Sequence, residues 1–121
     1  MSEIYRSRHF AAGSPKDIPL HTSLFIDCTF EDYPEDGKDI RESSFVRCHF
    51  SRSSLCKAQM HAAKFLECDF IDVDFRAANL VDAVFSRCTF RRCYFSRNNL
   101  GAETDLTHTR FIDSKPINCV F

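Results

Sequence analysis

The sequence has no tryptophan, only three glycines and four prolines, and no long apolar run. Without a run of about 18 apolar residues we expect no membrane-spanning helix, and residues 1 to 25 hold no stretch of signal-peptide type. Neither charge sign dominates, because 16 Lys and Arg face 17 Asp and Glu for a net charge of −1. This balance lacks the basic footprint of a nucleic-acid-binding protein. At 121 residues, we therefore expect one cytoplasmic domain with no nucleic-acid or membrane partner.

Large apolar residues recur every five positions, and phenylalanine dominates them. Of the 16 multiples of five from 25 to 100, 15 are Phe, Leu, Ile or Met, and Glu35 is the exception. Two positions earlier stands a small residue, usually Ser, Cys, Ala or Val. A period of five matches neither the 3.6 of a helix nor the 2 of a strand. It indicates a coil in which each side contributes one large and one small side chain to the interior.

These repeats resemble the pentapeptide-repeat family, whose motif is commonly written A(D/N)Lxx. Ala78-Asn79-Leu80 matches the motif literally, and Cys68-Asp69-Phe70 and Ala83-Val84-Phe85 vary it. The resemblance covers about residues 21 to 121. It implies an all-β fold, a right-handed quadrilateral β-helix with four pentapeptides per turn, and therefore about five coils.

A turn of twenty residues has support within the sequence itself, because residue type recurs at that spacing. Each of three core columns keeps its own preference: Phe25, Phe45, Phe65 and Phe85; Phe30, Phe50, Phe70, Phe90 and Phe111; Ile40, Met60, Leu80 and Leu100.

The repeat has three irregular parts. Residues 1 to 20 are interpreted as an N-terminal cap or irregular lead-in to a β-helix over residues 21 to 121. Residues 31 to 39 contain Pro34, Glu35 and Gly37, which predict a bulged side. Between residues 101 and 105 one extra residue shifts the phase, so that the series continues at Leu106.

The seven cysteines invite a metal or redox interpretation, but their spacing favours structure. Those at 28, 48, 68 and 88 share one internal column, so we interpret them as small apolar spacers. Cys56 alone falls on an outward position and is the candidate reactive thiol. No histidine lies in a ligand or catalytic motif, and a convex rod offers no pocket for acid–base work. We expect no catalytic, cofactor or metal site, and hence no enzyme.

The outward positions show two patterns. One is charge that alternates in sign every twenty residues, in the columns Asp27, Arg47, Glu67, Arg87, His108 and Asp32, Arg52, Asp72, Arg92, Asp113. These columns indicate either stabilising ion-pair ladders or a charge-patterned binding face. The other pattern is apolar, in the column Ile26, Val46 and Leu66, which we take as a candidate protein interface.

The sequence stops in phase at Phe121, which predicts an uncapped last coil that pairs end to end with another subunit. The function we expect is a noncatalytic protein–protein interaction module, a rigid rod that self-associates through this coil. The alternative comes from the family resemblance, which includes quinolone-resistance proteins that mimic DNA and bind gyrase or topoisomerase IV. That activity needs a strongly acidic face, and no face of this sequence is strongly acidic.

Overall fold

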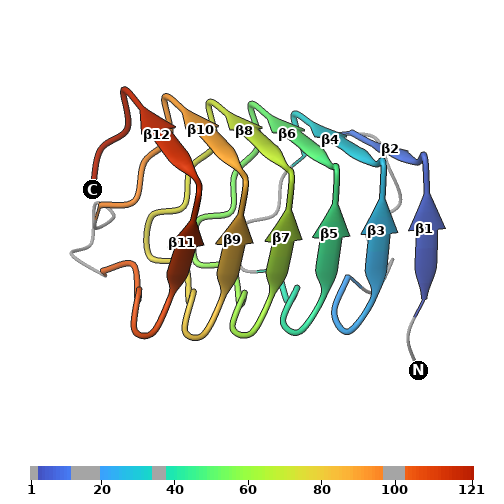
Figure 1. Ribbon diagram of the computed structural model, residues 1–121, viewed down its shortest axis with the longest axis horizontal. Helices are drawn as coiled ribbons and strands as arrows, with labels where there is room; N and C mark the ends of the chain where they lie inside the picture. The colour runs from blue at the N-terminus through green and yellow to red at the C-terminus, as the bar shows by residue number, and fades with distance from the viewer. Residues whose placement is uncertain (1–2, 12–19, 34–37, 97–102) are drawn as a thin grey trace.

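The computed structural model describes residues 3–11, 20–33, 38–96 and 103–121, which coil into a solenoid of parallel strands (Figure 1). Two sides of the solenoid are sheets of six strands each. Sheet A comprises β1 (Ile4–Arg6), β3 (Leu24–Ile26), β5 (Ser44–Val46), β7 (Lys64–Leu66), β9 (Val84–Ser86) and β11 (Arg110–Ile112). Sheet B comprises β2 (His9–Phe10), β4 (Thr29–Glu31), β6 (His49–Ser51), β8 (Asp69–Ile71), β10 (Thr89–Arg91) and β12 (Lys115–Ile117).

The other two sides are narrower and consist of single parallel bridges. The third side joins Ser54, Asp74, Tyr94 and Val120, and the fourth joins Asp39, Gln59, Asn79 and Asp105. About four turns contribute to all four sides, with a partial turn at each end, instead of the predicted five coils. The all-β, four-sided β-solenoid is otherwise the fold that the repeat predicted.

The core is a set of aromatic stacks that follow from the twenty-residue register. Phe45 and Phe65 stack with ring centroids 4.7 Å apart, one strand spacing. Neighbouring columns meet edge to face, as Phe65 and Phe70 do at 5.4 Å. Both arrangements are favoured by the ring quadrupole, so each phenylalanine stabilises contacts along its column and across to the next one.

Backbone with positive φ occurs at the corners, at residues that are not glycine. Ala62 has a φ of 60° and Lys57 one of 62°, each at the third position of a turn such as Leu55–Ala58. The Ala58 N–H donates to the Leu55 carbonyl at 3.1 Å, the pattern of a type II turn. Corner N–H groups also donate to the next coil, as Ala62 does to the Val81 carbonyl at 2.9 Å. These inter-coil bonds offset the cost of left-handed backbone.

The second position of the family motif has a physical role on the third and fourth sides. The Asn79 side-chain oxygen accepts the Val81 N–H at 3.1 Å, and the Asp74 carboxylate accepts the Arg76 N–H at 2.9 Å. Such bonds two residues forward hold the chain in the following turn. The described strands of sheets A and B lack this contact, because there the residue two positions forward still belongs to the strand, as Ile26 does after Leu24.

The N-terminal prediction needs correction, because part of residues 1 to 20 is already solenoid. Strand β1 pairs in parallel with β3, and β2 pairs with β4. Tyr5 stacks on Phe25 at 4.9 Å, and Phe10 stacks on Phe30 at 4.8 Å. The short polar strands β1 and β2 hide this coil, because Tyr5 lies in phase but is not one of the Phe, Leu, Ile or Met residues that define the repeat. Residues 12–19 lie outside the described part.

The phase shift is also larger than predicted. Phe111 pairs with Phe85, and Pro116 pairs with Phe90, so the register widens from 20 residues to 26. Phe111 therefore continues the column of Phe85, not that of Phe90, and Leu106 aligns with Leu80 in place of Leu100. A shift of six residues looks like a shift of one in a five-residue repeat, so the sequence could not separate them. Residues 97–102, Leu100 included, lie outside the described part.

The predicted bulge at residues 31 to 39 lies only partly within the described residues, since 34–37 fall outside them. At its start, the buried ring of Tyr33 packs against Phe10 and Phe30, each at 5.8 Å. Its N–H donates to the Ser53 hydroxyl at 3.2 Å, which aligns Tyr33 with a position that other coils fill with a small residue. An aromatic ring thus enters the core next to the irregular side. Among the described residues, no helix is long and apolar enough to cross a membrane.

The left-handed corner predicts a sharp difference between two valine substitutions. Ala62→Val should lower the free energy of unfolding by roughly 1–2 kcal/mol, because a β-branched residue is strained at positive φ. Ala62→Gly should be tolerated. Ser44→Val, at an outward strand position, is the control and should change stability by less than about 0.5 kcal/mol. Urea unfolding followed by circular dichroism measures all three, and equal stability of the two valine variants would contradict the assignment.

Candidate interaction surfaces

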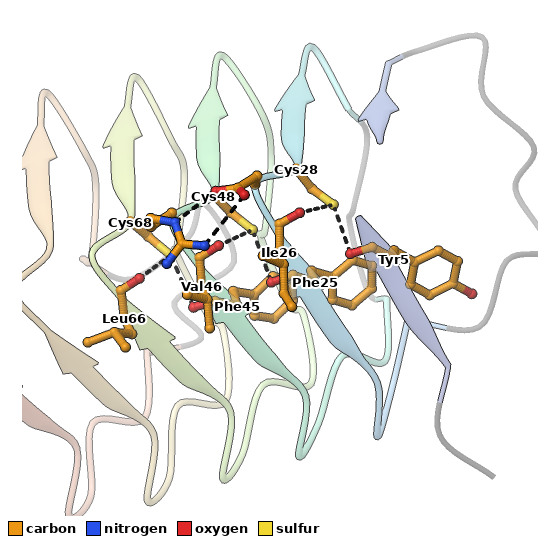
Figure 2. Close-up of polar contacts among 11 residues, drawn as sticks. Tyr5, Phe25, Ile26, Cys28, Phe45, Val46, Cys48, Leu66 and Cys68 are labelled. Atoms are coloured by element: carbon orange, nitrogen blue, oxygen red, sulfur yellow. Dashed lines mark hydrogen bonds and ion pairs between the residues drawn. The ribbon is translucent and has the colours of Figure 1, made fainter. Parts of the chain in front are cut away.

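The predicted apolar column lies on the outward face of sheet A. Ile26, Val46 and Leu66 are direct register partners on β3, β5 and β7, and each is half-buried. Figure 2 shows the three side chains on successive strands. Leu24 and Val84 lie in the parallel column of the same face. The structure therefore brings together the three residues that the sequence proposed as an interface.

A shallow hollow lies over the middle of this face. Its volume is about 320 Å³, and its outward lining consists of Ser44, Val46, Lys64, Leu66, Val84 and Ser86. The small serines on β5 and β9 leave the depression between the larger side chains. The sequence could not show it, because it depends on how the two columns lie side by side.

Phe121 lies beyond the column Ile26, Val46 and Leu66, in the coil that contains β11 of sheet A and β12 of sheet B. Its side chain is 63% exposed and stacks on Phe95 at 4.8 Å. Phe111 and Val120 in the same coil are 40% and 47% exposed. This coil therefore presents a second apolar surface, separate from the one on sheet A.

The cysteine column forms a ladder of thiols inside the solenoid (Figure 2). The Cys48 thiol donates to the Phe25 carbonyl at 3.5 Å, and the Cys68 thiol donates to the Phe45 carbonyl at 3.3 Å. Burial raises the pKa of Cys28, and it raises the pKa of Cys93 to about 12. The raised pKa keeps Cys28 and Cys93 protonated, and protonated thiols are poor nucleophiles and poor ligands.

Cys56, the candidate reactive thiol, is half-buried on the third side. Its N–H donates to the Ser54 hydroxyl at 3.4 Å. Its reactivity stays a prediction. Within the described ranges, no three His, Cys, Asp or Glu side chains gather in a group that could hold a metal ion.

The charged columns form inter-coil ion pairs at the corners. Arg47 lies 2.9 Å from Asp27, and Arg52 lies 3.0 Å from Asp32. Two further pairs belong to the same columns, Arg92–Asp72 at 2.7 Å and Arg87–Glu67 at 3.8 Å. Arg52 also lies 2.9 Å from Glu31. All of these side chains are exposed, so each pair contributes little stability. The pairing favours the ladder interpretation of these columns.

The last members of both columns were assigned wrongly, because of the six-residue shift. His108 faces Asp82, with Nδ1 3.6 Å from the carboxylate, and does not follow Arg87. Asp113 comes after Ile112, which pairs with Ser86, so Asp113 aligns with Arg87 and not with Arg92.

Comparison with known proteins agrees with this geometry. A family model described as pentapeptide repeats (8 copies) matches residues 68–100. The comparison with curated proteins gave no match. Among solved structures, a pentapeptide repeat protein (Rfr23) from the cyanobacterium Cyanothece 51142 superposes with a TM-score of 0.74 at 11% identity, over 98% of this chain and 86% of that one.

Two trypsin-treated variants of QnrB1, a plasmid-mediated fluoroquinolone resistance protein, are also similar, each at 14% identity. One gives a TM-score of 0.69 over 98% of this chain and 58% of its own, and the other gives 0.57 over 100% and 70%. At these identities the likeness shows the fold alone. A four-sided solenoid of stacked five-residue units defines the structural class. Residues 68–100 match the pentapeptide-repeat family model, and the described chain has the fold of the solved pentapeptide-repeat protein.

The ion-pair ladders predict a measurable pKa change. A hydrogen bond from Arg92 holds the pKa of Asp72 below its ordinary value of 3.8. A lowered carboxyl pKa stabilises the fold above the unfolded-state pKa, and that contribution is lost as the pH falls through the folded-state pKa. In Arg92→Gln, the pKa of Asp72 should rise toward the ordinary value, as measured by NMR titration of the carboxyl carbons. Asp32, paired with Arg52, is the internal control, and an unchanged Asp72 titration would refute the pairing.

Proposed function

We propose that this protein is a noncatalytic protein–protein interaction module whose main contact surface is the outward face of sheet A. The observation that carries the proposal is the alignment of Ile26, Val46 and Leu66 on adjacent strands of one rigid face. Parallel pairing holds these side chains one strand spacing apart, so the surface is formed before any partner arrives. Preorganisation of this kind lowers the entropy cost of association.

Two further features concern the cysteines, the first their structural role and the second the cellular compartment. The buried thiols bond to backbone carbonyls inside the solenoid, which suits a structural role. All seven cysteines are free of disulfide bonds, which suits a reducing compartment such as the cytoplasm.

The alternative function, modulation of DNA gyrase or topoisomerase IV, has only the fold likeness to QnrB1 in its favour. A DNA mimic needs a continuous acidic face. Here the exposed carboxylates of Asp27, Asp32 and Asp72 each pair with an arginine of the next coil. These two corner columns therefore present paired charges and no continuous acidic stripe, and we favour the interaction module.

A substitution on the face tests the proposed function. Val46→Lys places a charge in the middle of the apolar column and should remove the proteins that the wild-type chain retains from a native lysate. Ile71→Lys is the matched control, because Ile71 is an exposed apolar residue on β8 of sheet B. Quantitative mass spectrometry of the captured proteins gives the readout. The proposal requires that some proteins are captured by the wild-type chain and by Ile71→Lys but not by Val46→Lys. Identical sets of captured proteins for all three chains would overturn it.

We also propose that the protein self-associates through the coil of β11 and β12. Phe111 and Phe121 are exposed there, whereas their column counterparts Phe85 and Phe95 are buried. A second copy placed against this coil would continue the aromatic stacks that run through the solenoid. Burial of one large apolar side chain contributes about 1.5–3 kcal/mol.

Light scattering after size-exclusion chromatography tests this association. Wild type should form a dimer at micromolar concentration, and Phe121→Asp should shift the species to monomer, since a charge cannot enter the stack. Ile4→Asp, which alters an exposed residue at the opposite end of sheet A, is the control. A wild-type chain that stays monomeric at these concentrations would refute the proposal.

A further inference from the structure

The outward positions of sheet A carry charge of one sign only. In chain order they are Ile4, Arg6, Leu24, Ile26, Ser44, Val46, Lys64, Leu66, Val84, Ser86, Arg110 and Ile112. Among the described strands of this sheet, no outward position holds a carboxylate. Within the described residues, no ion pair joins Arg6, Lys64 or Arg110 to an acid, whereas the arginines of the corner ladders are paired. The face is therefore apolar with uncompensated positive charge.

The strands of sheet A stack along the axis of the solenoid (Figure 1), so the columns of outward side chains run along this axis, and the hollow is lined by β5, β7 and β9. Successive outward side chains in a column are separated by one coil, and the stacked rings of Phe45 and Phe65 put that spacing at 4.7 Å. A ligand that contacts several coils must present side chains at a similar interval. This interval distinguishes a helical ligand from an extended one.

An α-helix aligned with the solenoid axis comes close to this interval. Its turns repeat every 5.4 Å, so over the three spacings from β3 to β9 it drifts by roughly 2 Å. An extended strand presents same-face side chains about 6.7 Å apart and drifts by roughly 6 Å over the same distance. A helix can therefore keep an apolar residue over each of Ile26, Val46 and Leu66, and a strand cannot.

The charge of sheet A favours a helix from another protein over a second copy of this chain as the ligand. If two copies paired through sheet A, each would bring Arg6, Lys64 and Arg110 to the interface and no carboxylate from the strands. Lys64 borders the hollow, where an apolar partner would leave its ammonium group buried and unpaired at high cost. A partner with carboxylates beside its apolar stripe satisfies this group.

Resting on the proposed function, we propose that sheet A binds an amphipathic helix with acidic residues along the border of its apolar stripe. The apolar residues of the helix lie over Ile26, Val46 and Leu66, and a carboxylate pairs with Lys64. The Ser44 and Ser86 positions leave room for larger side chains of the helix.

Designed peptides test the proposal directly. One probe is a fluorescein-labelled 16-residue helical peptide with Leu at i, i+3, i+4 and i+7 spacing and Glu on the flanking positions. A second probe replaces those Glu residues with Lys, and a third alternates Leu and Glu to favour an extended strand. Fluorescence anisotropy should show that the acidic helix binds the wild-type chain at least tenfold more tightly than either other peptide.

Variants of the protein locate the binding. Lys64→Glu should weaken the acidic helix at least tenfold and strengthen the basic one, while Ile71→Lys should change neither. Unfolding midpoints of the variants confirm that each is folded. Equal binding of acidic and basic helices, tighter binding of the alternating peptide, or no effect of Lys64→Glu would each overturn the proposal. So would a dimer that Val46→Lys dissociates, because sheet A would then be covered by a second copy.

Failure of the helix proposal can be distinguished from failure of the proposed function. If Val46→Lys still loses native partners while the peptides show no preference, sheet A is an interaction surface for a different chemistry. If Val46→Lys loses nothing, the surface itself is refuted.

Discussion

The structure depends on one constraint, that each residue of a coil must stack directly on its counterpart in the next coil. Parallel backbone hydrogen bonds impose this, as when the Leu24 N–H donates to the Glu3 carbonyl at 2.8 Å and the Ser44 N–H donates to the Ser23 carbonyl at 2.9 Å. Every side chain then has a neighbour of fixed identity at one strand spacing. Flat rings stack favourably at that spacing, which explains why phenylalanine fills most of the core columns.

The same constraint decides what the outside of the solenoid can carry. Like charges stacked at one strand spacing would repel, and the corners avoid this by alternating arginine with carboxylate, as Arg47 does above Asp27. The corners also need positive φ, and the residues there, such as Ala62, are not glycine. Hydrogen bonds between coils therefore offset the cost of left-handed backbone at the corners, and the four sides between the corners present flat faces.

Much of this could be predicted from the sequence, because stacking makes residue type periodic. The columns through Phe25 and Phe30, the buried cysteines and the alignment of Ile26, Val46 and Leu66 all follow from a spacing of twenty. What failed was the count of residues where the repeat is interrupted. A six-residue excess leaves the same phase as a one-residue excess, so Phe111 was placed in the wrong column. The polar first coil escaped as well, because Tyr5 lies in phase but was not recognised as a core residue.

A solenoid of this kind has no concave centre in which to place catalytic groups, so its chemistry depends on which faces escape internal pairing. On the two corners that flank sheet B, arginines pair with carboxylates of the neighbouring coil. On the outward face of sheet A, Lys64 stands among apolar side chains with no carboxylate on the strands beside it. A stacked fold can neutralise such a cation simply by placing an acid twenty residues away, as it does for Arg92. The described strands of sheet A hold no such acid, and for this reason the proposed helix binding depends on a carboxylate from the partner to pair with Lys64.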